Sequence, residues 1–262
     1  MENNIKMLKF KFYSAKSKDT TSYRSSTELY FNEHFDELRQ RLFFILSFLS
    51  LITLFTFYNV KLIVKILESP VTNIQFFQLS PGEYFVSTLV ISFYAGVIFS
   101  TPLLLSQTLF FFRPALTKNE KNIVVLLLIS SIFLFILGLI FSYFLLIPAA
   151  LNFFIFYGSE VVEPFWSFTQ YFNFVSTLFF STGLVFQVPI VQVILSLSRL
   201  IDPKKMLDYW RPMILFSTIL GAILTPSADP ITQLLLAGAL FFLYFLGSIT
   251  SINLIKKEAL NL

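Results

Sequence analysis

Six long stretches of this chain carry no charged side chain, and they limit the fold more than any other feature. A helix needs about 20 residues to cross the roughly 30 Å hydrocarbon core of a bilayer. The chain is also 56% apolar and only 13% charged. The sequence therefore predicts an all-α polytopic membrane protein with six transmembrane helices. The predicted spans are 42–60, 84–112, 122–159, 164–198, 212–228 and 230–255.

Some of these stretches do not have the length of one crossing. The third and fourth are too long, and we expect Pro148 and Pro164 to break them, which leaves a loop at about 149–168. We expect helices five and six to be short. Only 17 residues separate Arg211 from Asp229, and a helix of that length covers roughly 26 Å.

The basic residues predict the orientation of the bundle. With six spans both termini share one face, and 17 of the 19 Lys and Arg residues fall on that face. Because cytoplasmic loops carry an excess of Lys and Arg, both termini are predicted on the cytoplasmic or stromal side. This asymmetry accounts for the net charge of +4, so we expect no nucleic-acid partner.

We expect a single membrane domain over residues 31–255. A basic extension over 1–30, rich in Lys, Ser, Thr and Tyr, is predicted to be disordered, and a short tail follows over 256–262. No internal repeat is visible in the sequence. That absence disfavours a transporter built from inverted repeats.

The chain offers few groups for catalysis. An intramembrane aspartyl protease needs two facing carboxyl groups, and only Asp229 lies near membrane depth. The only histidine, His34, precedes the first span, which disfavours a Ser–His protease. There are no cysteines to bind a metal. We therefore predict that the protein is not an enzyme and holds no metal or cofactor.

Polar side chains inside the predicted spans are candidates for function, because such groups are unfavourable in hydrocarbon. They are Gln107, Gln187, Gln192, Asp229 and Gln233. Hydrogen bonding between helices is an equally good reading of Gln187 and Gln192. Asp229 also suits the N-cap of the sixth helix, with Pro230 at the first helical position.

Glu37 and Glu120 are carboxylates on the face where the basic residues gather. Two carboxylates at a membrane interface suit a cationic ligand, above all arginine, whose guanidinium can be held by two hydrogen bonds. Each has a structural alternative. Glu37 can pair with Arg41 one helical turn later, and Glu120 can form a capping box with Thr117.

Several motifs in order along the chain resemble the TatC family, the multispanning receptors of the twin-arginine protein translocase. The resemblance covers roughly residues 31–255. The motifs are HFDELRQRL at 34–42, SPGEYF at 80–85, P-x4-Q at 102–107, FFRPALTKNE at 111–120, FQVP at 186–189 and LTPSADPITQ at 224–233.

The resemblance implies a cupped bundle that binds the twin-arginine signal peptides of precursor proteins. It further implies that the chain recruits TatA-like and TatB-like single-span proteins for export driven by the proton-motive force. Self-association in a multimeric receptor complex within the lipid bilayer is also implied.

The resemblance also assigns roles to residues. The signal-peptide site would contain Glu37, Arg39, Leu42, Phe111, Pro114, Leu116 and Glu120. The partner-docking and intramembrane polar positions would be Gln187, Thr225, Asp229 and Gln233. Pro70 and Glu83 would shape the loop on the opposite face. Bacterial family members commonly carry glutamate at the position of Gln187, whereas glutamine cannot titrate, so we interpret Gln187 as a hydrogen-bonding residue.

Composition bears on the compartment. Residues with AT-rich codons dominate, including Phe at 35 positions, and SPGEYF, VEPFWSF and FQVP are most similar to the plastid and cyanobacterial branch of the family. We expect the plastid thylakoid membrane, with a bacterial or mitochondrial inner membrane as the alternative.

A secondary transporter or channel for a small solute is the alternative function. A membrane insertase is disfavoured, since no Arg lies inside a predicted span.

Overall fold

The computed structural model describes residues 36–70, 76–112, 123–158, 165–226 and 229–260. The chain divides into two compact units, Met1–Ser47 and Phe48–Leu262, and each is considered by itself. The expected disordered extension over 1–30 lies outside the described residues. In the first unit, residues 36–47 are helical and begin the helix Asp36–Tyr58.

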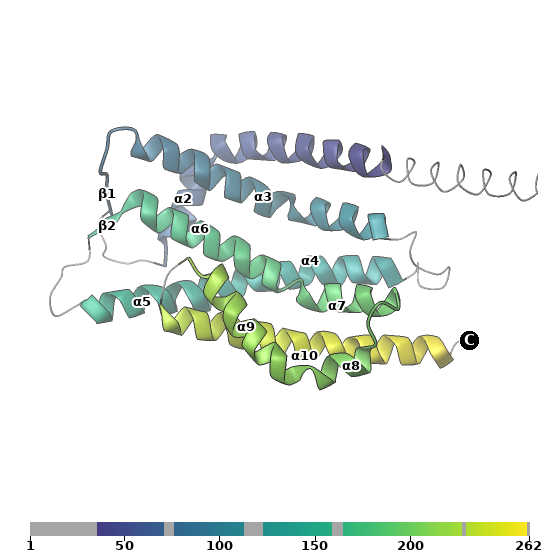
Figure 1. Cartoon of the computed structure of the whole chain (residues 1–262). Helices are drawn as coiled ribbons and strands as arrows, with labels where there is room; N and C mark the ends of the chain where they lie inside the picture. The colour runs from purple at the N-terminus through teal and green to yellow at the C-terminus, as the bar shows by residue number, and fades with distance from the viewer. Residues whose placement is uncertain (1–35, 71–75, 113–122, 159–164, 227–228, 261–262) are drawn as a thin grey trace, which may run out of the picture. The chain divides into compact units, whose positions relative to one another are not determined.

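The described residues are almost entirely helical (Figure 1). After the helix Asp36–Tyr58 come α2 (Val60–Glu68), α3 (Glu83–Phe112), α4 (Ile123–Phe141), a π-helical turn (Ser142–Leu146), α5 (Ile147–Gly158), α6 (Phe168–Val185), α7 (Val188–Leu197), α8 (Pro203–Asp208), α9 (Trp210–Leu224) and α10 (Pro230–Leu260). Two short strands, β1 (Phe76–Phe77) and β2 (Trp166–Ser167), complete the structure.

Five helical segments in the described residues are long and apolar enough to cross a membrane. They are Asp36–Tyr58, Glu83–Phe110, Ile123–Gly158, Phe168–Leu197 and Pro230–Lys256, and α9 is a shorter apolar helix. The prediction of an all-helical polytopic membrane protein is confirmed. The prediction of a short fifth helix is also confirmed, because α9 has 15 residues.

The predicted short sixth helix is wrong. α10 has 31 residues and continues past the expected start of the tail at residue 256 to Leu260. Hydropathy marks where a segment leaves the hydrocarbon, at Lys256. The backbone hydrogen bonds of a helix do not depend on hydropathy, so the helix extends beyond that point.

The predicted loop at about 149–168 is wrong in its first half. Residues Ile123–Gly158 form a single helical segment of 36 residues. A proline ring clashes with the carbonyl four residues earlier, here at Phe144, and the wider π-helical turn Ser142–Leu146 lies at that point. The turn relieves the clash, so the helix passes through Pro148.

α2 is an amphipathic helix. Val60 is buried, and Ile63, Val64 and Leu67 pack against the same core. These residues follow the i, i+3, i+4, i+7 spacing of one helical face. Before α2, residues 48–58 pack closely on α3. Thr56 Oγ1 donates to the Ser92 carbonyl at 2.8 Å, and a Cβ on Gly96 would clash with Thr53.

The core of the second unit is centred on α6, whose buried side chains meet those of the π-helical turn, α5 and α10. Its fully buried members include Phe172, Val175, Leu178, Leu146, Ile147, Leu236 and Leu240. Because lipid tails are as apolar as these side chains, close packing holds the helices together rather than exclusion of water.

A two-stranded parallel sheet joins two connections that are far apart in the sequence. Phe76 pairs with Trp166 and Phe77 with Ser167. The connections α2–α3 and α5–α6 therefore lie at the same end of the second unit (Figure 1). This pairing agrees with the predicted topology, which places both connections on one face of the membrane.

We predict that Phe172→Ala lowers the free energy of unfolding by on the order of 3–5 kcal/mol, because it leaves a cavity in the core. Thermal unfolding of the protein in detergent measures the effect. Phe133→Ala is the matched control, since Phe133 is 62% exposed. Equal losses in both variants would contradict a core centred on α6.

Candidate functional site

Glu37 lies in the first described turn of the helix Asp36–Tyr58 and is paired with Arg41. Glu37 Oε1 accepts hydrogen bonds from Arg41 Nε at 3.1 Å and from Nη2 at 2.7 Å. The side chains are 39% and 25% exposed. Arg39 lies 3.6 Å from Asp36 in a more exposed pair. The structural alternative for Glu37 is therefore realised, but exposed helix pairs of this kind contribute only about 0.3–0.5 kcal/mol.

The remaining predicted signal-peptide residues are only partly described. Leu42 is 53% exposed. Phe111 belongs to the last turn of α3, but its side chain lies outside the description. Pro114, Leu116 and Glu120 lie outside the described residues altogether. Whether Glu37 and Glu120 face each other remains a prediction from the sequence.

Gln187 is a hydrogen-bonding residue within the bundle. It is buried at the junction of α6 and α7. Its Nε2 donates to the Ser131 carbonyl of α4 at 3.1 Å, and its Oε1 accepts from the Ser131 hydroxyl. Both ends of the amide are thus occupied by one residue of a neighbouring helix. The sequence indicated Gln187 but gave no sign that Ser131 is its partner.

Gln192 makes a similar contact one helix further on. It is buried, and its Nε2 donates to the Ser248 hydroxyl of α10 at 3.2 Å. Its Oε1 has no hydrogen-bond partner within the described part of the chain. Gln107, on α3, is partly buried. The interhelical reading of Gln187 and Gln192 is therefore confirmed.

α9 packs on α10 through small and polar residues. Ser217, Gly221 and Thr225 follow one face of α9 at intervals of four residues and are buried. A Cβ on Gly221 would lie 3.0 Å from the carbonyl oxygen of Gln233, so the two backbones approach closely. Gln233 Nε2 donates to the Thr218 carbonyl at 3.4 Å.

The outer face of α9 is apolar and exposed. It carries Ile214, Leu215, Phe216, Ile219 and Ile223, which are 43–70% exposed. Thr225 is not part of this exposed face, because its side chain is buried; its hydroxyl donates to the Gly221 carbonyl of the same helix at 2.9 Å. Of the predicted docking residues, Gln233 joins α10 to α9 through Thr218 and Thr225 is buried at the end of α9, whereas the exposed surface of α9 is apolar.

Asp229 caps α10. Its side chain is fully buried, and Oδ2 accepts from the Thr232 amide at 2.9 Å and from the Thr232 hydroxyl. Pro230 occupies the first helical position. The N-cap prediction is confirmed, and the pattern D-P-x-T shows the partner three residues later that such caps use.

Glu83 joins the start of α3 to the two connections that carry the sheet. Its carboxylate accepts from the Leu79 amide, from the Ser80 amide at 3.3 Å and from the Ser167 hydroxyl at 2.8 Å. Ser87, one turn later, hydrogen-bonds Thr169 of α6. Pro70 lies in the turn after α2 and is partly buried. The sequence does not reveal that Ser167 binds Glu83 or that Thr169 binds Ser87, because more than 80 residues separate the members of each pair.

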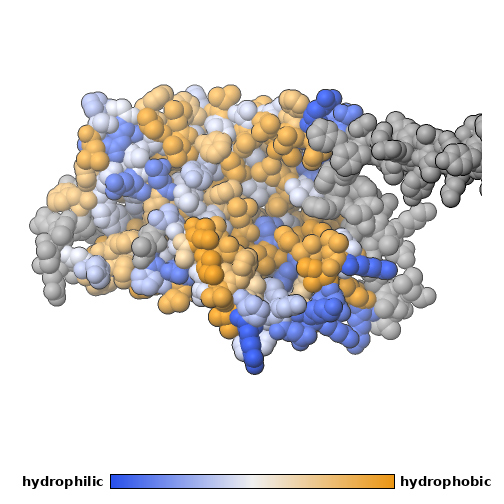
Figure 2. Space-filling model, viewed as in Figure 1, coloured by the Kyte–Doolittle hydropathy of each residue, from blue (hydrophilic) through white to orange (hydrophobic). Residues whose placement is uncertain are grey.

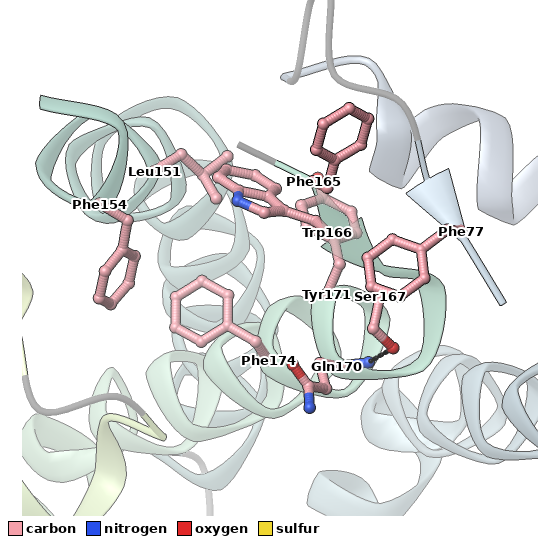
Figure 3. Close-up of a pocket in the computed structure, with 9 residues that line it drawn as sticks. All are labelled: Phe77, Leu151, Phe154, Phe165, Trp166, Ser167, Gln170, Tyr171 and Phe174. Carbon is pink, nitrogen blue, oxygen red and sulfur yellow. Dashed lines mark hydrogen bonds between the residues drawn. The ribbon is translucent and has the colours of Figure 1, made fainter. Parts of the chain in front are cut away.

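An aromatic pocket of about 330 Å³ lies beside this sheet (Figure 3). Trp166 stacks on Tyr171 at 5.9 Å, and Phe154 of α5 and Phe174 of α6 close another side. A second, apolar groove of about 760 Å³ runs between α4 and α10, with Phe186 among the residues that line it. Neither lining includes a charged side chain. Both linings are mainly aromatic and aliphatic and therefore suit apolar groups.

The described residues contain no group of three or more His, Cys, Asp or Glu side chains that could hold a metal.

Comparison with known proteins identifies the family. The model of the family "Sec-independent protein translocase protein (TatC)" matches residues 33–238, well over half of the 262 residues. The chain belongs to the TatC family.

Relatives of this TatC-family chain come from several lineages. It is 57% identical over 220 residues to an "Uncharacterized tatC-like protein ycf43" of Trieres chinensis, with 84% of each chain covered. It is 45% identical over 225 residues to the "Sec-independent protein translocase protein TatC" of Synechocystis, covering 86% of this chain and 88% of the relative. A chloroplastic TATC of rice (Oryza sativa) is 43% identical over 218 residues, covering 82% of this chain and 61% of the relative.

Solved structures agree with the family assignment. A crystal structure of the twin-arginine translocase receptor TatC is 31% identical in sequence and superposes with a TM-score of 0.73, covering 83% of this chain and 97% of the other. A second, determined in the detergent DDM, gives a TM-score of 0.75 at 32% identity. The TatC fold therefore extends over most of this chain, which is a multi-pass membrane protein.

We predict that Gln187→Leu lowers the free energy of unfolding of this TatC-family chain by about 1–2 kcal/mol, because Ser131 is left buried without its partner. In a double-mutant cycle, Ser131→Ala and Gln187→Leu should be coupled by about 0.5–1.5 kcal/mol. Thermal unfolding in detergent measures each variant. Ser130→Ala should instead add independently to Gln187→Leu, and additivity of the Ser131 pair would contradict the contact.

Proposed function

We propose that this chain is the signal-peptide receptor and core subunit of a twin-arginine protein translocase in the plastid thylakoid membrane. The family match over residues 33–238 carries the proposal, because that range includes the stretches around Glu37 and Glu120. The chloroplastic and cyanobacterial relatives support the compartment. A receptor of this kind acts by binding and has no need of a catalytic residue or cofactor.

The pairing of Glu37 supports a role in binding arginine. Its carboxylate already holds a guanidinium, that of Arg41, in a pair that is 39% and 25% exposed. Because such a pair is weak in water, the guanidinium of an incoming signal peptide can replace it. Glu120 would supply the second carboxylate, so that two arginines are each matched by one acid.

We predict that Glu37→Gln and Glu120→Gln each weaken binding of a twin-arginine precursor by on the order of 1.5 kcal/mol, about tenfold, since one charge-assisted contact is lost at a partly exposed site. Site-specific crosslinking of a precursor signal peptide to the reconstituted protein measures the loss. Asp36→Asn is the matched control, because Asp36 is the neighbouring acid and pairs with Arg39.

Normal crosslinking in both Glu37→Gln and Glu120→Gln would reject the assigned binding site. A precursor whose arginine pair is replaced by lysines should bind the unmodified protein less well, because lysine lacks the planar fork of arginine. Membrane insertion of each variant is checked separately, so that a loss of binding is not confused with a loss of protein.

We further propose that the exposed face of α9 and the adjoining part of α10 dock the transmembrane helix of a TatA-like or TatB-like partner. Two features support this surface. The outer side chains of α9 are apolar and exposed, and α9 has only 15 residues, about 22 Å of helix. A helix that short is mismatched to an ordinary bilayer, and association with another helix relieves the mismatch.

We predict that a cysteine at Ile223 forms a disulfide with a cysteine in the partner helix. The chain has no cysteine of its own, so single-cysteine variants need no further change. Ile223 is 70% exposed on α9, whereas Ile129 is 60% exposed on α4 and serves as the matched control. Equal crosslinking at both positions would indicate random collision in the membrane and would contradict the docking surface.

A transporter for a small solute is less well supported. In the described spans Gln187 and Gln233 are engaged with neighbouring helices, and Gln192 donates to Ser248. Solute flux through the protein alone in liposomes would favour that alternative, whereas co-purification with single-span partners favours the receptor.

A further inference from the structure

The connection between α7 and α9 gathers four exposed cations. Arg199, Lys204, Lys205 and Arg211 are all exposed, as are the two acids of the segment, Asp202 and Asp208. Asp202 caps α8 by accepting from the Lys204 amide at 3.0 Å. The segment therefore carries a net positive charge. Within the described part of the chain none of the four cations forms an ion pair.

This basic segment is attached part-way along α10 and not at its end (Figure 1). Pro203 and Met206 of α8 are buried, and the Met206 carbonyl accepts a hydrogen bond from Tyr244 of α10 at 2.6 Å. Tyr244 lies 14 residues after Pro230, where α10 begins, or about 21 Å along the helix. α8 therefore lies deeper along the bundle than the end of α10.

The length of α9 requires the same depth. At about 22 Å it is roughly 8 Å shorter than the hydrocarbon core, so its first residues lie within about 8 Å of the boundary when its last residues reach the opposite one. The same segment carries exposed apolar and aromatic side chains: Leu200 is 73%, Ile201 40%, Tyr209 60% and Trp210 43% exposed. Such residues belong to the membrane interface, where amphipathic rings are favoured.

Cations at this depth need a negative partner. Arg211 lies over the Trp210 ring, with Cζ 5.4 Å from the centroid, and the exposed lysines can extend toward the headgroups. Figure 2 shows hydrophilic residues gathered over α8 beside the hydrophobic surface of α9. A surface with cations and exposed apolar groups side by side matches a lipid leaflet better than an acidic protein segment, which would leave Leu200 and Ile201 in water.

We propose that Arg199, Lys204, Lys205 and Arg211 form a binding site for the headgroups of anionic phospholipids. The lipids belong to the leaflet on the side of the C-terminal end of α10. The site depends only on the geometry of α8, α9 and α10, so it stands whether or not the proposed receptor function holds. It would keep negatively charged lipids beside a helix that is too short for an ordinary bilayer.

The tryptophans allow a direct test, because the chain has only two, Trp166 and Trp210. Trp166→Phe leaves Trp210 as the sole reporter beside the four cations. This variant is reconstituted in two kinds of phosphatidylcholine vesicle. One contains brominated phosphatidylglycerol and the other contains brominated phosphatidylcholine at the same mole fraction, and in both lipids the bromine atoms lie near the headgroup end of the acyl chains. Quenching of Trp210 fluorescence then reports which lipid lies next to it.

We expect brominated phosphatidylglycerol to be enriched around Trp210 by roughly fivefold over brominated phosphatidylcholine. Lys204→Gln with Lys205→Gln should lower that preference, Lys204→Arg with Lys205→Arg should keep it, and high salt should weaken it. Lys61→Gln with Lys65→Gln is the matched control, since these lysines lie exposed on α2 and should not affect Trp210.

Trp166 serves as a control reporter. In Trp210→Phe, the remaining Trp166 lies at the end of the second unit that carries the sheet, and it should be quenched equally by the two lipids. The proposal is overturned if Trp210 shows no preference for phosphatidylglycerol, or if its preference survives the double glutamine substitution at Lys204 and Lys205.

Discussion

Backbone amides inside the hydrocarbon core must find their hydrogen bonds within the protein, and three interruptions of helices within the described residues are resolved locally. The π-helical turn Ser142–Leu146 lets the third span continue through Pro148. At the α6–α7 junction the backbone hydrogen bonds continue. The backbone N–H of Gln187 donates to the Leu184 carbonyl, and the backbone carbonyl of Gln187 accepts from the Ile190 N–H, both at 3.0 Å. At the start of α10 the Asp229 side chain accepts from the Thr232 amide.

The same constraint divides the side chains by role. Polar groups within the bundle are used to join helices: Gln187 to Ser131, Gln192 to Ser248 and Gln233 to Thr218. Binding must then depend on the surfaces that remain exposed. The surfaces that we propose for binding are the carboxylate of Glu37, the apolar face of α9 and the basic segment around α8. A receptor that recognises peptides and recruits other helices needs surfaces of these kinds, and none requires a titrating group at membrane depth.

The parts of the fold that follow from composition were predictable. Charge-free length predicted the spans and the short α9, and D-P at 229–230 predicted the cap of α10, because these patterns reflect local preferences. The continuation of the helix through Pro148 was not predictable, since it depends on a widened turn in a densely packed region. The length of α10 was missed because hydropathy reports the edge of the membrane and not the end of a helix.

By itself, the sequence determined the class of protein, the family, and the charged and polar residues worth testing, because burial of charge in a bilayer is so unfavourable that composition alone constrains topology. The tertiary structure decided what each of those residues does. Pairing of Gln187 with Ser131, of Glu83 with Ser167 and of Met206 with Tyr244 joins positions 38–84 residues apart. Contacts at that separation depend on how helices pack against one another, which no local pattern encodes.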